Sequence, residues 1–449
     1  MQQQRRLFLK NVLTGSLGLA ALSSLQLTAM SKALAAQSAP VTGYKALVCV
    51  FLFGGNDSAN MLIPLAGDSL NHYLAARQTL AVTGALPITP ITAVKDGIGL
   101  HPSLSPLQSL FSGGQLAVVG GVGALQRPTT AAEVKNGSAI LPANLYSHND
   151  QQATWMRGQE PMLLNRGWGA QMLELLQSSP DFSSVISLAG SNLWQRGQLL
   201  QPFGMSANGV PSLAAHNGTS SRAQLIKKLQ ASLLGQQSDP LANLYAQSNS
   251  AAQARGALVA DALTQAPAMS TPFAADINLA QQLKMVAKLI SVQAKFGVGR
   301  QVFFVSMGGF DTHDAQNTVH PTLLANLGAA LASFYQATTE LGVAEQVTTF
   351  TMSDFGRTLS SNGDGTDHGW AGNQLVLGGA VKGREIYGQL IEQRLGSAFD
   401  VGGGRMIPTT ANAQMFASLA SWFGLSDSQR LQVFPALSAF STSALPLFR

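Results

Sequence analysis

Four continuous apolar runs stand out along the chain, and glycine or polar residues follow each of them. They cover Tyr44–Phe53, Gln115–Gly123, Val302–Ser306 and Val347–Met352. A run that is apolar at nearly every position predicts a strand that is buried on both faces, as in a parallel sheet covered by helices.

Segments with helical spacing of apolar residues alternate with these strands. The clearest of them cover Ser103–Ser112, Trp168–Leu176, Pro321–Leu341 and Ala411–Phe423. Strands that alternate with helices predict an α/β fold with a largely parallel sheet.

The middle of the chain, about 201–296, has a different character. Alanine, glutamine, serine and leucine dominate it, and apolar residues recur at helical spacing in Ala223–Leu234, Pro240–Leu263 and Ile277–Phe296. We expect a helical insertion that covers one face or edge of the sheet. It holds few acid–base groups, so no chemistry is expected there.

The N-terminus resembles an export signal. Residues 4–10, QRRLFLK, resemble a twin-arginine motif, the stretch from Val12 to Ala29 is mildly apolar, and Ala33 and Ala35 suit a signal peptidase. This pattern predicts a signal peptide over 1–35 and delivery to the periplasm, or export, by the twin-arginine translocation machinery. The remainder, 40–449, is expected to form a single α/β domain. The alternative is an N-terminal membrane anchor, for which the stretch is short and rich in Gly, Ser and Thr. No stable membrane span is expected after cleavage.

Composition narrows the class of protein. Hydrophobic residues make up 46% of the chain and charged residues 11%, which excludes general disorder. The formal charge of +5 comes mostly from four basic residues within 1–35, so the remainder is nearly neutral and a nucleic-acid partner is not expected. The only cysteine, Cys49, lies in an apolar run, so we expect it to be a buried core residue. A single cysteine allows no internal disulfide, and thiolate chemistry is not expected.

Carboxylates and histidines follow three of the predicted strands. The candidate metal ligands, in chain order, are Asp57, Asp311, His313, Asp354, Asp367 and His368. Because the carboxyl ends of parallel strands meet at one edge of a sheet, we expect these side chains to gather there. Carboxylates and imidazoles without thiolates suit Zn, Mn, Mg or Fe ions. The alternative for Asp57 or Ser58 is a helix N-cap.

Two further residues are candidates for catalysis. Ser147 precedes a predicted helix whose first N–H groups would hold an anion, unless Ser147 is only a cap and His148 faces solvent. Arg357 would clamp a phosphoryl or sulfuryl group, unless it pairs with Asp354 or Asp367.

Four segments together resemble a known family. In chain order they are FLFGGNDSANMLIPL, YSHNDQQATWMRG, GGFDTHDAQ, and SDFGRT followed by GTDHGW. They resemble DUF1501, a family of exported bacterial proteins of unknown function that looks like a branch of the alkaline phosphatase and sulfatase superfamily. The resemblance implies a three-layer α/β/α sandwich, two metal ions and a Ser, Thr or modified Cys nucleophile.

The superfamily pattern implies roles for the candidate residues. It places Asp57 as the first ligand and Ser147 as the nucleophile, although Ser58 is nearer to Asp57 in sequence. Asp311 and His313 match the next ligand pair, with a shorter spacing than the pattern has.

The remainder of the pattern fits less well. The expected Asp-His dipeptide is Asp354 followed by Phe355, unless Asp367 with His368 takes that place, and His368 is otherwise the last ligand. One histidine is missing unless His148 or His320 supplies it. The resemblance therefore implies one or two divalent ions.

Two functions remain open at this stage. The first is an exported metal-dependent hydrolase that acts on a small anionic substrate, a phosphate or sulfate ester. The alternative is a non-catalytic periplasmic scaffold or binding protein with a degenerate or structural metal site. A redox metalloprotein has less support, because the chain lacks a thiolate or haem signature.

Overall fold

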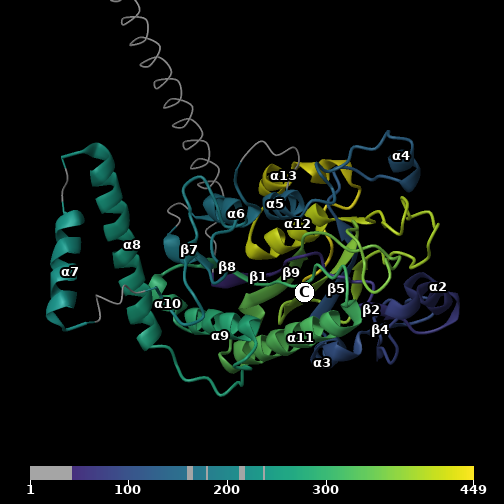
Figure 1. Cartoon of the computed structure of the whole chain (residues 1–449), viewed down its shortest axis with the longest axis horizontal. Coiled ribbons are helices and arrows are strands. Elements are labelled where there is room, and N and C mark those ends of the chain that lie inside the picture. The colour runs from purple at the N-terminus through teal and green to yellow at the C-terminus, as the bar shows by residue number, and fades with distance from the viewer. Residues whose placement is uncertain (1–42, 159–164, 178–180, 212–217, 236–237) are drawn as a thin grey trace, which may run out of the picture.

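The computed structural model describes residues 43–158, 165–177, 181–211, 218–235 and 238–449. The predicted signal peptide over 1–35 lies outside the described residues. A sheet of nine strands forms the centre of the chain, with the order β11-β5-β10-β9-β1-β8-β6-β7 and β12 paired to β5 (Figure 1). A second, three-stranded sheet has the order β2-β4-β3.

The strands have the following bounds. They are β1 Lys45–Leu52, β2 Leu62–Pro64, β3 Leu86–Ile88, β4 Ile98–Leu100, β5 Leu116–Gly123, β6 Val185–Ser187, β7 Phe203–Gly204, β8 Arg300–Met307, β9 Val347–Ser353, β10 Gly372–Gly378, β11 Ile386–Gly388 and β12 Thr410–Ala411.

The helices have the following bounds. They are α2 Gly67–Arg77, α3 Ser105–Ser112, α4 Ala131–Lys135, α5 His148–Arg157, α6 Trp168–Leu176, α7 Ser221–Leu233, α8 Pro240–Thr264, α9 Asn278–Ser291, α10 Gln293–Phe296, α11 Gln316–Glu340, α12 Asn412–Phe423 and α13 Asp427–Val433.

Strand β1 is buried on both faces. Val48 and Val50 contribute to the hydrophobic core on one face of the sheet, whereas Leu47, Cys49 and Phe51 contribute to the core on the other face. The alternation follows from the two-residue period of a strand. It explains why the whole run is apolar and why Cys49 is buried, as predicted.

Helices cover both faces of the sheet. The core on one face includes side chains of α3, α9 and α11, and the core on the other face includes side chains of α5, α6, α12 and α13. In the second core Trp168 stacks on Phe416 with the ring centroids 4.6 Å apart. Figure 1 shows the two helical layers on either side of the sheet. The fold is therefore a mixed α/β fold with a mostly parallel central sheet, as predicted.

The strand directions determine where the candidate residues meet. Strand β1 pairs in parallel with β8 and β9. Strand β10 is antiparallel to β9 and to β5, so it begins at the edge where β1, β5, β8 and β9 end. The segments that follow these four strands, and the segment that enters β10, therefore lie at one edge of the sheet.

Helices α7 and α8 stand beside the sheet, away from the two covering layers (Figure 1). Helix α9 packs against the sheet instead, because nine of its fourteen residues are buried. The single helix that the spacing predicts over Ile277–Phe296 is two helices in the structure, α9 and α10. Within the described ranges, no helix combines the length and the apolar character that crossing a bilayer requires.

Candidate metal centre

A glycine turn at the end of β1 brings the other strand ends close together. Gly54 has φ +114°, and a Cβ there would lie 2.4 Å from the backbone nitrogen of Asp311. Gly55 has φ +84°, and a Cβ there would lie 2.4 Å from the ring of Phe355. Only glycine fits a left-handed backbone with neighbours at these distances, so this turn lets the loops after β8 and β9 approach β1.

Three imidazoles surround the carboxylate of Asp311 at this edge. The Nε2 atom of His148 lies 3.4 Å from Asp311 Oδ2. The Nε2 atoms of His313 and His368 lie 3.0 and 3.2 Å from Asp311 Oδ1, and 3.0 Å from each other. The ligand atoms of His148, Asp311 and His368 all lie within 4.8 Å of one another.

The other ring nitrogen of each histidine contacts an oxygen. His148 Nδ1 lies 2.6 Å from Asp354 Oδ2, His368 Nδ1 lies 2.8 Å from the backbone carbonyl of Tyr146, and His313 Nδ1 lies 3.3 Å from Asp367 Oδ1.

These contacts determine the tautomers. A carbonyl oxygen only accepts, so His368 Nδ1 is the donor. Asp354 Oδ2 also accepts from Gln152 and from the backbone N–H of Gly54, so His148 Nδ1 donates to it as well. The neutral form of each ring then has its lone pair on Nε2. Metal-ligating histidines are oriented in this way by a carboxylate or a backbone carbonyl.

The resulting donor set fits a divalent metal ion. Converging lone pairs on Nε2 atoms and a carboxylate repel one another unless a cation, either a metal ion or added protons, lies between them. Imidazole and carboxylate ligands suit Zn, Mn or Fe ions. The cluster is open to solvent, since its side chains are between 23% exposed at His368 and 45% exposed at His313.

Asp354 is a buried carboxylate behind His148. Its side chain is fully buried, and burial raises the pKa of its carboxyl group above the usual value. Its Oδ1 atom is buried without a hydrogen-bond partner, while Oδ2 accepts from His148. Asp354 therefore orients the imidazole of His148.

Phe355 packs against two of the imidazoles. Its ring centroid lies 5.0 Å from that of His148 and 4.6 Å from that of His368. The superfamily pattern expects a histidine at this position, and the phenyl ring supplies packing without a ligand atom.

Asp57 lies apart from the cluster. Its carboxylate forms an ion pair with Arg77, and neither side chain is exposed. Gln316 Nε2 donates to the same carboxylate at 2.6 Å. Burial raises the pKa of the Asp57 carboxyl group, but the charges of Arg77 and His320 and the hydrogen bonds from Arg77 and Gln316 lower it by more, so the net pKa is below the usual value. A guanidinium thus occupies the position beside Asp57 where a cation would bind, and the structure does not bring Asp57 to the histidines.

The guanidinium of Arg357 also donates its hydrogen bonds to groups inside the protein. Its buried side chain donates to Asp311 Oδ1 at 2.9 Å, to the Gly54 carbonyl at 3.0 Å and to Thr366 Oγ1 at 2.8 Å. Its carboxylate partner is Asp311, and neither Asp354 nor Asp367 pairs with it. It holds Asp311 in place instead of presenting a guanidinium to solvent.

The two candidate nucleophiles differ in their surroundings. Ser147 is the N-cap residue of α5, is half-buried and makes no side-chain cap hydrogen bond. Ser58 is buried, and its hydroxyl accepts from the backbone N–H of Asn373 at 2.8 Å. Ser147 directly precedes the cluster residue His148 in the chain, and its hydroxyl does not cap α5.

The sequence pattern assigned some positions and missed others. Asp311, His313 and His368 lie in the cluster, whereas Asp354 and Asp367 contact the outer nitrogens of two imidazoles. His148 was only a substitute candidate, because a lone histidine at a helix start is usually solvated. Its position after β5, at the same sheet edge, is the signal that could have identified it.

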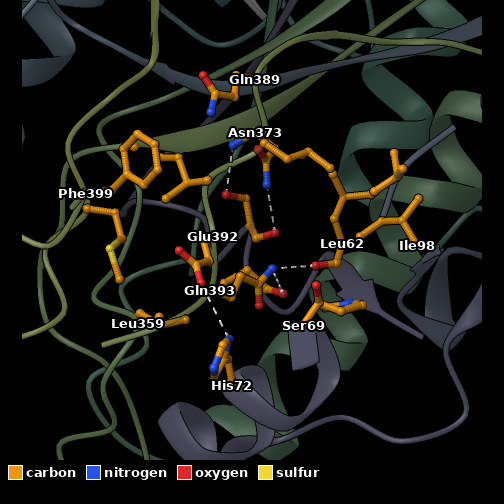
Figure 2. A pocket seen from close by; sticks show the side chains of 18 of the residues that line it. Leu62, Ser69, His72, Ile98, Leu359, Asn373, Gln389, Glu392, Gln393 and Phe399 are labelled. Atoms are coloured by element: carbon orange, nitrogen blue, oxygen red, sulfur yellow. Dashed lines mark hydrogen bonds and ion pairs between the residues drawn. The ribbon is translucent and has the colours of Figure 1, made fainter. Parts of the chain in front are cut away.

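A separate cavity of about 580 Å³ lies beside the site. Figure 2 shows Leu62 and Ile98 on one side and Phe399 on the other, with the Gln393 amide donating to the Leu62 carbonyl at 2.9 Å. Arg357 lines this cavity, but the cluster residues His148, Asp311 and His368 do not. The candidate metal site is thus an open surface site, distinct from the cavity.

Comparisons with known proteins give a family but no activity. The family model described as "Protein of unknown function (DUF1501)" matches residues 44–399. No curated protein matches the chain.

Several solved structures are similar at low identity. Ps i-CgsB is 10% identical, with 88% of this chain and 76% of that chain covered and a TM-score of 0.37. A putative sulfatase from Bacteroides thetaiotaomicron is 10% identical, with 88% of this chain and 75% of that chain covered and a TM-score of 0.31. A mutant of the alkaline phosphatase PafA is 11% identical, with 71% of this chain and 64% of that chain covered and a TM-score of 0.28. Likeness at this level assigns no activity to the chain.

Proposed function

The chain belongs to the DUF1501 family, whose description gives no activity. We propose that it is a metal-dependent hydrolase, from the geometry of the site, and that its substrates are phosphate or sulfate esters, from the resemblance of its sequence motifs to the alkaline phosphatase and sulfatase superfamily. The observation that carries the proposal is the convergence of three imidazole Nε2 atoms on Asp311, each with its Nδ1 atom turned to an oxygen.

The proposed ligands are His148, Asp311 and His368, with His313 at the side of the cluster. A single ion is proposed, because Arg77 and Gln316 already satisfy Asp57. When bound, such an ion would supply Lewis acidity that polarises an ester oxygen. The exposure of the ligands leaves room for a substrate, which is typical of catalytic sites and not of closed structural ones.

The surrounding residues have distinct proposed roles. Ser147 is the proposed nucleophile, at the start of α5 and next to His148. Arg357 holds Asp311 by a charge-assisted hydrogen bond and does not bind the anion, because its donors are already engaged. Asp354 and Asp367 orient the imidazoles of His148 and His313.

Export by the twin-arginine route remains part of the proposal. It rests on the motif in residues 4–10 and on the small residues Ala33 and Ala35. Processing to a chain that begins near residue 36, and its disappearance when Arg5 and Arg6 are both replaced by Lys, would test this route.

One observation favours the non-catalytic alternative. Arg357, the cation expected to hold the anionic group, is buried and directed at Asp311. A periplasmic binding or scaffold protein with a structural metal site would have the same ligands and no need for a free cation.

Turnover measurements separate the two functions. Metal-free protein is loaded with one equivalent of Zn²⁺, Mn²⁺, Mg²⁺ or Fe²⁺ and assayed with an aryl phosphate and an aryl sulfate. The hydrolase proposal expects turnover that falls at least about 100-fold in Ser147→Ala and in His148→Ala, with Ser58→Ala as the matched serine control. Metal binding without turnover would establish the non-catalytic function.

A further inference from the structure

Helices α7 and α8 expose an unusual amount of apolar surface. Across the described ranges, 16 large hydrophobic side chains are exposed, and seven of these are on α7 and α8. Leu225 and Leu229, one turn apart on α7, are 59% and 55% exposed, and Leu241, Leu244 and Tyr245 at the start of α8 are 77%, 60% and 65% exposed. Exposed apolar groups gathered in this way mark an interaction surface.

On α8 the exposure is greatest at the N-terminal end, while Leu258 near the other end is 47% exposed. Val259 and Ala262, near the end of α8 that leads to α9, are buried, whereas Leu241, Leu244 and Tyr245 lie at the opposite end of the same helix. Figure 1 shows this pair of helices extending away from the sheet. The C-terminal end of α7 and the N-terminal end of α8 form the tip, since they are close in sequence.

The charge on α7 has one sign. The helix carries Arg222, Lys227 and Lys228 and no acidic residue. The lysines precede Leu229 directly, so cations flank the exposed leucines. A helix with exposed leucines and a basic polar face is typical of segments that lie in the interface of an anionic membrane.

We propose that the tip formed by α7 and the start of α8 docks on an anionic lipid surface. Leu225, Leu229, Leu241 and Leu244 enter the interface, and the Tyr245 hydroxyl stays at the level of the headgroups. Lys227 and Lys228 contact lipid phosphates.

A second copy of the chain fits the tip less well. Two copies that join through the tip would bring together three cations from each copy, Arg222, Lys227 and Lys228. Each copy offers one carboxylate there, Asp239, which already accepts the N-cap hydrogen bond of α8. The net repulsion opposes association at low salt. The charge therefore favours lipid phosphate over a second copy as the occupant.

Co-sedimentation with vesicles tests the proposal. The full chain is mixed with neutral phosphatidylcholine vesicles and with vesicles that contain phosphatidylglycerol. We expect a higher partition coefficient for the anionic vesicles, a decrease with salt, and at least a tenfold loss in the double variant Leu241→Gln with Leu244→Gln. The double variant Lys227→Gln with Lys228→Gln should lose the preference for anionic vesicles.

Matched controls show whether the effect belongs to the tip. A double variant at exposed leucines elsewhere, Leu74→Gln with Leu395→Gln, should bind vesicles as the wild type does. Circular dichroism confirms that each variant is folded. Equal binding by wild type and the Leu241→Gln/Leu244→Gln variant would contradict the proposal. So would a wild-type dimer in size-exclusion chromatography that this variant converts to monomer.

Discussion

At the scale of single residues, one glutamine determines the direction of a buried hydrogen-bond chain. Asp57 only accepts, so the Gln316 amide N–H₂ group faces Asp57 and its Oε1 atom accepts from Thr312 and from Thr366, at 2.9 and 2.7 Å. Thr366 Oγ1 is then free to accept from Arg357 Nε, and Arg357 donates to Asp311. The ion pair of Asp57 with Arg77 is thus connected to the proposed metal ligand.

Replacing Gln316 by Leu tests this connection. The change leaves the two threonine hydroxyls without their acceptor and removes a donor from Asp57, so we expect a loss of about 1–3 kcal/mol in the free energy of unfolding. Metal affinity should fall by roughly 10-fold to 100-fold, since residues that orient ligands act at this level. Urea unfolding of the metal-free protein and a Zn²⁺ titration measure the two effects.

Gln282→Leu is the matched control. Gln282 is a buried glutamine on α9 that exchanges two hydrogen bonds with the backbone of Ser306, away from the cluster. The free energy of unfolding should fall in Gln282→Leu about as it does in Gln316→Leu, but the metal affinity of Gln282→Leu should equal that of the wild type. An equal loss of affinity in both variants would show that Gln316 acts through stability alone.

At the scale of elements, continuous apolar runs predicted the central strands, while one helix began earlier than predicted. The sequence pattern starts a helix at Pro321, because proline favours a first helical turn. The structure begins α11 at Gln316. The extra residues are held by contacts that no local pattern reveals, among them the bond from the Gln316 N–H to the Asp364 carbonyl at 3.0 Å.

The end of α11 gives a pH-dependent prediction. Hydrogen bonds from Thr271 and Ser270, both side chain and backbone, lower the pKa of Glu340 from 4.5 to about 2. A carboxyl group whose pKa is lowered by folding stabilises the folded state above its unfolded pKa, and this contribution is lost as the pH falls toward the folded pKa. The free energy of unfolding of the wild type should therefore be higher than that of Glu340→Gln, and this difference should be larger at pH 6 than at pH 3. Urea unfolding at the two values checks this, and a difference independent of pH would refute it.

At the scale of the whole molecule, strand order brings together residues that are far apart in sequence. The positions after β1, β8 and β9 were predictable, because apolar runs mark strand ends. The pairing of Asp57 with Arg77 was not, since a helix residue 20 positions away supplies the partner through tertiary packing. His148 was not among the predicted metal ligands for the same reason, because its position relative to Asp311 depends on the placement of α5.

The central claim is that His148, Asp311 and His368 bind one divalent ion. Titration of the metal-free chain with Zn²⁺, followed by elemental analysis after dialysis, measures it most directly. The account predicts one ion per chain and an affinity at least about 100-fold lower in His368→Ala. His72→Ala, which removes another half-exposed histidine that faces a carboxylate, serves as the control and should bind as the wild type does. Two ions per chain, no ion, or unchanged affinity in His368→Ala would contradict the account.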